Sequence, residues 1–373
     1  MTIYVILLLW VITCSLAEPV IWKYGESRYI SGRAVCLILS FGAIWLISAL
    51  RASTVGTDTS AYTLFYIKSA ASSLEDILKT NNPLFLGKEV ISWLLGYISS
   101  AAPMYVIWTS TVTAIGFGFF VWKTSPKIWL SAFLFLTLGL FFQSMNAARQ
   151  YVGLGLSLIA VVYFHRSLYS PKGWVLFLLA VWIHNVSLTF LPVIIGIWLV
   201  KHCHSYRFLY GVSTIASLSF IIIFKNLAYF FAILFPHYVG YVNGAGDYNL
   251  FQENTSGRMM ALVYTVFLFF LIMYYSILKN EKGPSVKRIT DSFIPGAIFG
   301  TLIGLAFFSS SLVNRICWTY NCLFLAIIPY TIINLKKNTR ALVALIMMAL
   351  FIACYLRLAY VGNSGVVPYQ IWL

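Results

Sequence analysis

A succession of long apolar runs is the feature that most constrains the fold of this chain. They are Thr2–Ala17, Ala34–Leu50, Met104–Trp122, Trp129–Gln143, Tyr151–Phe164, Phe208–Phe224, Met259–Leu278, Phe293–Phe308, Ile316–Leu335 and Ala341–Tyr360. A transmembrane helix needs about 20 mostly apolar residues, so the shorter runs require tilt or local thinning of the bilayer. Because lipid offers the backbone no hydrogen bonds, each run is expected to form an α-helix.

The composition agrees with a chain embedded in lipid. It is 61% hydrophobic and only 9% charged, whereas soluble domains carry about 25% charged residues. We predict an all-α polytopic membrane protein with about 10–12 transmembrane helices, forming a single integral membrane domain over residues 1–373. The net charge of +15 is assigned to cytoplasmic loops, so membrane lipid is expected as a partner and nucleic acid is not.

Sequence motifs for metal or nucleotide chemistry are lacking. The six cysteines form no C-x-x-C pair, so neither a disulfide framework nor a metal site is indicated. His202, Cys203 and His204 stand together in a basic loop, where a solvated loop is favoured over a metal site. Walker A, GxGxxG, GxSxG and HExxH motifs are absent from the sequence. We therefore expect no metal, no cofactor and no nucleotide-sugar domain.

One further apolar stretch, Trp174–Val200, is interrupted by His184-Asn185 and by Pro192. Cytoplasmic loops are enriched in basic residues. The basic loops of this chain alternate correctly only if both ends of the stretch are cytoplasmic. We therefore expect a broken, re-entrant pair of half-helices, of the kind that lines a polar cavity.

This topology places a small number of polar segments on the outer side of the membrane. They are Arg51–Lys88, Ser144–Arg149, Pro236–Arg258 and Ser309–Arg315. Residues 51–103 are expected to form an outer loop that includes an interfacial amphipathic helix at Glu89–Ala101. Residues 236–258 are rich in Gly, Asn and Tyr, and are expected to form a flexible outer loop.

Four arginines are expected at the outer ends of helices, although basic residues usually lie on the cytoplasmic side of a membrane protein. They are Arg51, Arg149, Arg258 and Arg315, and the last three are each expected in the first turn of a helix. The planar guanidinium suits bidentate contact with phosphate oxygens, and a helix N-terminus also favours an anion. Simpler interpretations are open: Arg51 as a cation after a helix C-terminus, and Arg149 or Arg258 as anchors to lipid headgroups.

Polar neighbours accompany two of these arginines. Asn146 precedes Arg149 by three residues, so on a continuous helix the two share a face. Asn314 directly precedes Arg315. With Gln150 and Tyr62, these asparagines are the expected supporting polar residues of a site for a phosphorylated, membrane-embedded substrate.

Two residues are candidates for proton transfer. His184 is the one histidine inside an apolar run, and a histidine there is costly unless it has a partner or a function. It can serve as a general base, or it can pack against a backbone carbonyl at the helix break. Asp58 is one of ten acidic residues. It can act in catalysis, pair with Arg51, or cap the next helix.

These residues stand in motifs that resemble the EpsG-like branch of Wzy-type polysaccharide polymerases. The motifs are Arg51 with Val55-Gly-Thr-Asp58-Thr and Tyr62, Asn146-x-x-Arg149-Gln150, His184-Asn-x-Ser187, and Asn314-Arg315 with Tyr320. The resemblance runs from about Arg51 to Tyr330. It implies a GT-C-like helical architecture in the bacterial cytoplasmic membrane, with the active site facing outward.

The resemblance also implies a reaction. Such proteins join oligosaccharide repeat units carried on undecaprenyl diphosphate, use no nucleotide sugar or metal, and are implied to work with a chain-length-regulating co-polymerase. Arg149 and Arg315 would hold the donor diphosphate, His184 would be the base, and Arg51 and Asp58 would shape the outer cavity. The absence of a spaced carboxylate pair argues against ordinary glycoside hydrolysis.

Two alternative functions remain open at this level. One is an O-antigen ligase that transfers finished polymer, although this chain lacks a very large soluble outer loop. The other is a transporter or flippase of lipid-linked sugars, which broken helices with polar residues would suit. Against transport, the sequence has no internal repeat, and the arginines gather on one side.

Overall fold

The computed structural model describes residues 1–24, 28–80, 86–202, 205–234, 239–240, 257–280 and 288–372. The described chain forms two compact units, one of residues 1–188 with 338–373 and one of residues 189–337. Nothing in the sequence predicted this division. Each unit is described by itself below.

The first unit is built from helices and one β-hairpin. Its elements are α1 (Thr2–Thr13), η1 (Cys14–Leu16), β1 (Ile21–Tyr24), β2 (Arg28–Ser31), α2 (Gly32–Ala49), α3 (Thr59–Ala71), α4 (Leu74–Thr80), α5 (Gly87–Gly96), α6 (Ala102–Thr124), α7 (Ile128–Thr137), α8 (Leu140–Asn146), α9 (Ala148–Arg166), α10 (Pro171–Ile183), α18 (Lys337–Tyr360) and η6 (Asn363–Gly365). The strands pair in antiparallel register, with Trp22 opposite Ile30. The hairpin is a small departure from the predicted all-helical chain.

The second unit is helical throughout its described residues. Its elements are η3 (Asn185–Phe190), which begins in the first unit, α11 (Leu191–His202), α12 (Tyr206–Leu234), α14 (Gly257–Asn280), η5 (Asp291–Phe293), α15 (Ile294–Ala306), α16 (Ser311–Asn321) and α17 (Phe324–Ile333). Asp291 is a polar anchor of this unit at 1% exposure. It accepts hydrogen bonds from the Tyr274 hydroxyl, from the Tyr206 hydroxyl at 3.2 Å and from the Arg288 backbone N–H at 3.0 Å.

The predicted class of an all-α polytopic membrane protein is confirmed. Six helices are long and apolar enough to cross a membrane, or up to eight if each bent pair is one span, within the described residues. Shorter apolar helices lie at Thr2–Leu16, Pro171–Ile183 and Asp291–Ala306, so a total of 10–12 crossings requires these to cross as well. The number of uninterrupted membrane-spanning helices was overestimated from the sequence, because helix breaks inside apolar runs could not be located there.

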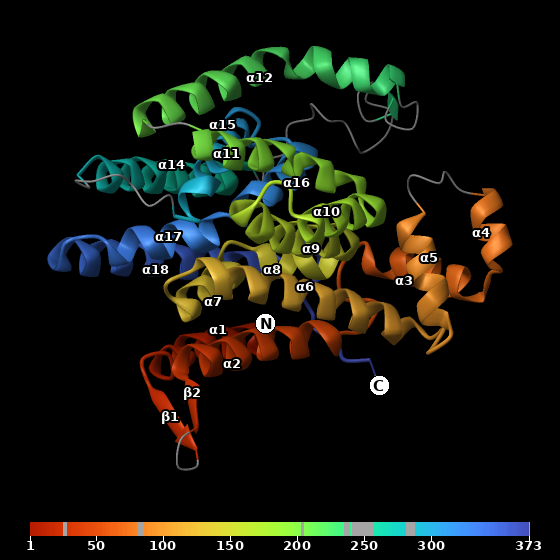
Figure 1. The fold of residues 1–373 in the computed structure, drawn as a ribbon. Coiled ribbons are helices and arrows are strands. Elements are labelled where there is room, and N and C mark those ends of the chain that lie inside the picture. Colours follow the sequence, from red (N-terminus) through yellow and green to blue (C-terminus); the bar gives the residue numbers. More distant parts are fainter. Residues whose placement is uncertain are drawn as a thin grey trace. The chain divides into compact units, whose positions relative to one another are not determined.

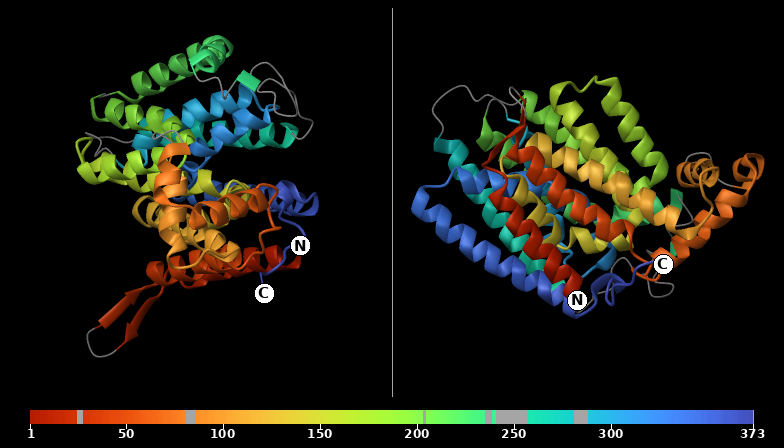
Figure 2. Two further views of the ribbon diagram at one scale, coloured as in Figure 1. Left: turned by 90° about the vertical axis from the view of Figure 1, so that its right-hand side faces the viewer. Right: turned by 90° about the horizontal axis from the view of Figure 1, so that it is seen from below.

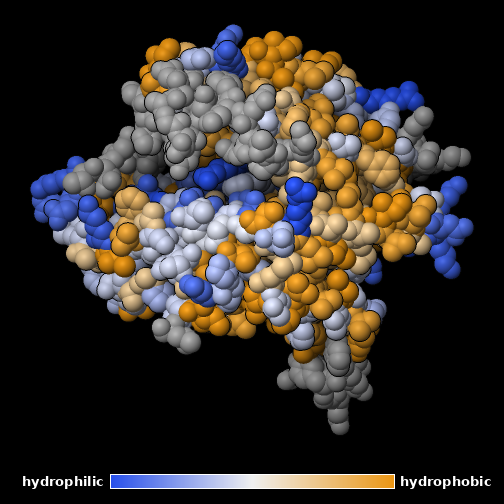
Figure 3. Space-filling model, turned by 180° about the vertical axis from the view of Figure 1, so that it is seen from behind, coloured by the Kyte–Doolittle hydropathy of each residue, from blue (hydrophilic) through white to orange (hydrophobic). Residues whose placement is uncertain are grey.

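Apolar side chains cover much of the outer surface of these helices. In α12 and α18 only 22% of the most apolar window is buried within the protein, and Ile222 is 79% exposed. Figure 3 shows wide hydrophobic areas on one face of the molecule. Such exposure is unfavourable in water and expected in lipid.

Several breaks divide the predicted spans. The run Trp129–Gln143 is split into α7 and α8, which meet at 59°, and the run Ile316–Leu335 into α16 and α17, which meet at 48°. The predicted break at His184-Asn185 is confirmed: α10 ends at Ile183 and the 3₁₀ helix η3 follows. The re-entrant path of this segment stays a prediction. Most of the predicted outer loop at residues 236–258 lies outside the described residues.

The core of the first unit is a stack of helices around α9. Helix α9 packs against α6 on one side and α10 on another, and α3 packs against α5 and α6 (Figure 1). Helices α1 and α2 lie side by side (Figure 2). Prolines in the first turn begin α6 and α10, because a helix leaves those N–H groups without an intrahelical partner anyway.

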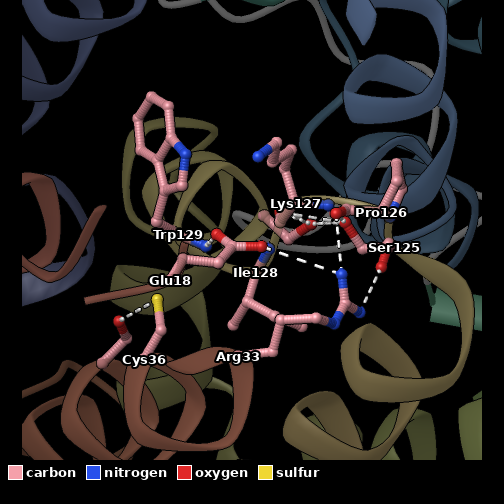
Figure 4. Close-up of polar contacts among 10 residues, drawn as sticks. Glu18, Arg33, Cys36, Ser125, Pro126, Lys127, Ile128 and Trp129 are labelled. Atoms are coloured by element: carbon pink, nitrogen blue, oxygen red, sulfur yellow. Dashed lines mark hydrogen bonds and ion pairs between the residues drawn. The ribbon is translucent and has the colours of Figure 1, made fainter. Parts of the chain in front are cut away.

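A buried carboxylate joins the beginning of the chain to α7 (Figure 4). Glu18 is 6% exposed and accepts hydrogen bonds from the backbone N–H groups of Ile128 at 3.0 Å and Trp129 at 3.2 Å. Arg33 lies 3.7 Å from the same carboxylate and donates to the carbonyls of Ser125 and Pro126. The carboxylate thus satisfies N–H groups at the start of α7, where the helix dipole favours negative charge.

We predict that Glu18→Gln lowers the free energy of unfolding by about 1–3 kcal/mol, because a buried charge-assisted acceptor is lost. The measurement is the Tm of the detergent-purified protein. The matched control is Glu75→Gln, which removes only an exposed ion pair to Lys79 and is expected to leave Tm nearly unchanged. Equal Tm values for the two variants would contradict the assignment.

Candidate functional site

The site of the first unit is organised by a buried guanidinium just beyond α2. Arg51 is 1% exposed. It donates to the Ser48 carbonyl, to Ser110 Oγ at 3.0 Å and to the Met145 carbonyl at 3.0 Å. Burial lowers the pKa of Arg51 from 12.5 to about 10, so the side chain remains charged at neutral pH. These contacts point to a supporting role, and its predicted contact with a diphosphate stays a prediction.

Asn146 ties the loop after Arg51 to the end of α8. Its Oδ1 accepts hydrogen bonds from Thr57 Oγ1 at 2.9 Å and from the Asp58 backbone N–H at 2.8 Å. Gly56 makes the close approach possible, with φ of +101° and with only 2.5 Å between an added Cβ and Thr59 Oγ1. Asp58 is the N-cap residue of α3, but its side chain does not cap the helix. The loop therefore has a fixed position beside the α8–α9 junction.

The predicted shared face of Asn146 and Arg149 is wrong. Helix α8 ends at Asn146, and Ala147 has non-helical φ and ψ of −88° and 48°. The break is stabilised by tertiary contacts, because the Met145 carbonyl accepts from both Arg51 and Thr59 Oγ1 and Asn146 Oδ1 accepts from the loop after Arg51. The placement of Arg149 in the first turn of α9 is confirmed.

Arg149 lies over aromatic rings of α3. Its guanidinium carbon is 3.7 Å from the centroid of the Tyr62 ring and 5.7 Å from that of Phe65. The Tyr62 hydroxyl donates to Asp58 Oδ2 at 3.5 Å. No oxygen atom among the described residues accepts a hydrogen bond from Arg149. A guanidinium stacked in this way is held in place by its planar face, which leaves its edge donors for another group.

A pocket opens beside Arg149, with an empty volume of about 270 Å³ that includes solvent at its mouth. It is lined by Tyr62, Phe65, Tyr66, Ser69, Lys88, Glu89, Ser92, Tyr105, Trp108 and Arg149. Of these, only Arg149 and Tyr62 were predicted as site residues. Glu89 could have been noticed as an acidic residue that begins an otherwise apolar amphipathic stretch. The aromatic residues could not, because rings are common throughout the chain.

His184 lies close to α9 on the turn that follows Arg149. It ends α10 in an extended conformation, and its backbone N–H donates to the Ala180 carbonyl at 2.9 Å. A Cβ built on Gly153 would lie 3.6 Å from the Cβ of His184 and 2.4 Å from Ser187 Oγ. Gly153 is therefore required for this close approach of α9 and the α10–η3 break. Arg149 and Gly153 are four residues apart and share a face of α9. Because His184 packs against Gly153, it lies on the same side of α9 as Arg149.

The remaining predicted residues occupy two units. Gln150 is buried in the first unit. In the second unit, Asn314 accepts from the Tyr264 hydroxyl at 2.9 Å and donates to the Phe308 carbonyl at 2.8 Å. Arg315 is the fifth residue of α16, so its predicted first-turn position is wrong by about one residue. Arg258 is in the first turn of α14, as predicted. The grouping of these arginines around one diphosphate stays a prediction.

Metal ligands do not gather in the described part of the chain. No group of three or more His, Cys, Asp or Glu side chains there could hold a metal ion. Cys203 and His204 of the His202–His204 trio lie outside the described residues. The first unit instead has cationic and aromatic groups around a pocket.

The sequence model of the EpsG family matches residues 34–371, which is nearly the whole chain. The chain belongs to the EpsG family. EpsG is a family of exopolysaccharide and O-antigen polymerase-like proteins, so this EpsG-family chain is a polysaccharide polymerase-like membrane protein. The predicted resemblance is confirmed. Comparisons with curated proteins and with solved structures find no significant match.

We predict that Arg51→Ala lowers the free energy of unfolding by about 1–3 kcal/mol, since it removes buried hydrogen bonds that join α2, α6 and α8. Arg149→Ala is expected to leave stability almost unchanged, because no described hydrogen bond is lost. The measurement is Tm of the two purified variants beside the wild type. A stable Arg51 variant would show that this guanidinium is not the structural support inferred here.

Proposed function

We propose that this EpsG-family chain is a glycosyltransferase that polymerises lipid-linked oligosaccharides. Its substrate is a repeat unit carried on a polyprenyl diphosphate, of the undecaprenyl type, on the outer face of the bacterial cytoplasmic membrane. Family membership over residues 34–371 and the set of apolar helices support a polymerase-like membrane protein. The proposed substrate rests on the chemistry of the site, and the proposed side of the membrane rests on the distribution of basic loops in the sequence.

The observation that carries the proposal is the position of Arg149. Its guanidinium lies at the N-terminal end of α9, on the rim of a pocket. It is stacked on Tyr62 rather than paired with a carboxylate. Ala147 supplies no side-chain cap to α9, so the positive end of the helix dipole adds to the charge of the arginine. Both features favour a bound anion such as a diphosphate.

The proposed reaction is a substitution at the anomeric carbon of the donor sugar. The acceptor hydroxyl oxygen forms the new glycosidic bond, while the bond to the diphosphate oxygen breaks and its electron pair leaves with the diphosphate. His184 takes the proton of the acceptor hydroxyl. Arg149 stabilises the charge that grows on the leaving group. Asp58 holds the Tyr62 ring beneath Arg149 through the tyrosine hydroxyl.

Residues of the second unit complete the proposal. On the sequence motifs we also propose Arg315, with Arg258 in a weaker role, as diphosphate ligands, and Asn314 as their support, which its hydrogen bonds to Tyr264 and Phe308 hold in place. Guanidinium groups then supply the positive charge that a metal would otherwise provide, so the proposed reaction is metal-independent and of the GT-C type. A co-polymerase that regulates chain length is the proposed protein partner.

We predict that Arg149→Lys reduces polymer formation by about 10²-fold or more, because lysine offers neither the planar stack on Tyr62 nor a bidentate fork. The measurement is the length distribution of polymer and lipid-linked intermediates in a deletion strain that carries each variant. Single repeat units are expected to accumulate.

The matched control is Arg166→Lys, at the exposed C-terminal end of the same helix, which should polymerise normally. If Arg149→Lys makes full-length polymer at normal membrane abundance, the proposed clamp is refuted. Accumulation of finished chains on the carrier lipid would instead indicate a ligase, and repeat units trapped on the inner leaflet would indicate transport.

We predict that His184→Gln lowers the rate of polymerisation by about 10²–10⁴-fold, the usual contribution of a general base, without weakening the binding of the lipid-linked donor. The rate is measured with purified protein in nanodiscs, and binding is measured separately on the same samples. His202→Gln, at the exposed end of α11, is the control. Unchanged turnover in His184→Gln would assign the base to another residue.

A further inference from the structure

Three buried polar atoms without a hydrogen-bond partner among the described residues belong to side chains that line the pocket beside Arg149. They are Glu89 Oε2 on α5 and, on α6, Tyr105 Oη and Trp108 Nε1. Tyr105 is 2% exposed and Trp108 is 8% exposed. Native proteins rarely bury polar atoms without a partner, because each loses its hydrogen bonds to water. Three such atoms in one pocket indicate a polar ligand.

Neighbouring polar groups of the pocket wall are bonded within the protein. The Tyr66 hydroxyl donates to the Ser99 carbonyl at 2.5 Å, and Ser92 Oγ donates to the Lys88 carbonyl at 2.7 Å. The second oxygen of Glu89 lies 3.4 Å from Lys88 Nζ. These bonds hold the wall in place, and its buried hydrogen-bonding capacity that is left over lies on Glu89, Tyr105 and Trp108, beside the donors of Arg149.

Aromatic rings surround these three polar atoms. Tyr105 meets Trp108 edge-on at 6.1 Å, and lies 6.0 Å from Tyr66 and 6.3 Å from Tyr62. Beneath them is a buried apolar cluster that includes Val152 and Ile183. A wall that combines ring faces with a carboxylate acceptor and N–H and O–H groups matches a molecule with both C–H surfaces and hydroxyls.

We propose that this pocket binds the sugar ring that is linked directly to the donor diphosphate. A sugar hydroxyl donates to Glu89 Oε2, the Trp108 N–H donates to a sugar oxygen, and the Tyr105 hydroxyl donates or accepts. Arg149 lines the same pocket, so a diphosphate on its guanidinium places the first sugar next to these groups. The inference rests on the proposed function and adds the subsite that selects the donor sugar.

The dimensions and polarity of the pocket favour one ring over other occupants. The empty volume of about 270 Å³ includes open solvent, and the enclosed part of the pocket has room for little more than a water-sized group such as a hydroxyl. It accepts one sugar edge rather than an oligosaccharide. A lipid chain would leave all three polar atoms unpaired. Ordered water is the remaining alternative, and the experiment below tests it.

The test compares two lipids on the full-length protein in nanodiscs. The probes are undecaprenyl diphosphate and the same lipid carrying the first sugar of the host strain's repeat unit, and the measured quantity is the Kd of each. Glu89→Gln and Tyr105→Phe are expected to weaken binding of the sugar-bearing lipid about tenfold, while the bare lipid binds as to the wild type. Arg149→Lys is expected to weaken both.

Glu75→Gln is the matched control, since Glu75 is exposed on α4 and pairs only with Lys79 among the described residues. Both pocket substitutions are nearly isosteric, and an unchanged Tm shows that the variants fold. Wild-type affinity of both variants for both lipids, or equal weakening for both lipids, overturns the inference and leaves water as the occupant. Binding of neither lipid by the wild type overturns the proposed function, and this inference with it. Full affinity of Arg149→Lys together with lost sugar preference in Glu89→Gln overturns the arginine clamp and supports the sugar subsite.

Discussion

The buried guanidinium of Arg51 is the contact on which the geometry of the site depends. It joins the end of α2, α6 and the last turn of α8 through the Ser48 carbonyl, Ser110 and the Met145 carbonyl. Charged groups are costly inside a protein unless they are hydrogen-bonded or paired, and these acceptors take both terminal nitrogens of Arg51, although its Nε has no partner among the described residues. With those acceptors in place, the segment that follows Arg51 cannot move independently of α8. The position of Asp58, and through it Tyr62 and Arg149, follows from this fixed segment.

A second constraint is the scarcity of polar groups in a lipid-facing bundle. Helices such as α12 and α18 present apolar side chains outward, so unsatisfied polar atoms are conspicuous when they occur. Three of those found among the described residues, on Glu89, Tyr105 and Trp108, belong to one pocket where α3, α5, α6 and α9 meet, next to a stacked arginine. The same physics supports the proposed roles of Arg149 as a diphosphate ligand and of Glu89, Tyr105 and Trp108 as sugar ligands. The last three each carry a buried polar atom without a hydrogen-bond partner among the described residues, and Arg149 stacks on Tyr62 with no hydrogen bond described for its donors.

Local sequence patterns predicted most of the secondary structure and part of the site. Apolar runs predicted the helices, the polar His184-Asn185 pair predicted the break after α10, and Arg149 was correctly placed at a helix start. The break at Ala147 was missed, because alanine favours helix and the break arises from contacts of Met145 and Asn146 with residues about 90 positions earlier in the chain. The kink between α7 and α8 lies inside an apolar run with few polar signals.

By itself, the sequence determined that the chain is a bundle of apolar helices, that its family motifs are those of EpsG, and that a few arginines stand at helix ends. Composition and short motifs suffice for these conclusions because they depend on each segment's own solubility in lipid. Only the tertiary structure distinguished the arginines. Arg51 donates hydrogen bonds to acceptors of the protein, whereas Arg149 lines a pocket. It alone brought Glu89, Tyr105 and Trp108 together, because a pocket between helices is set by packing across distant segments.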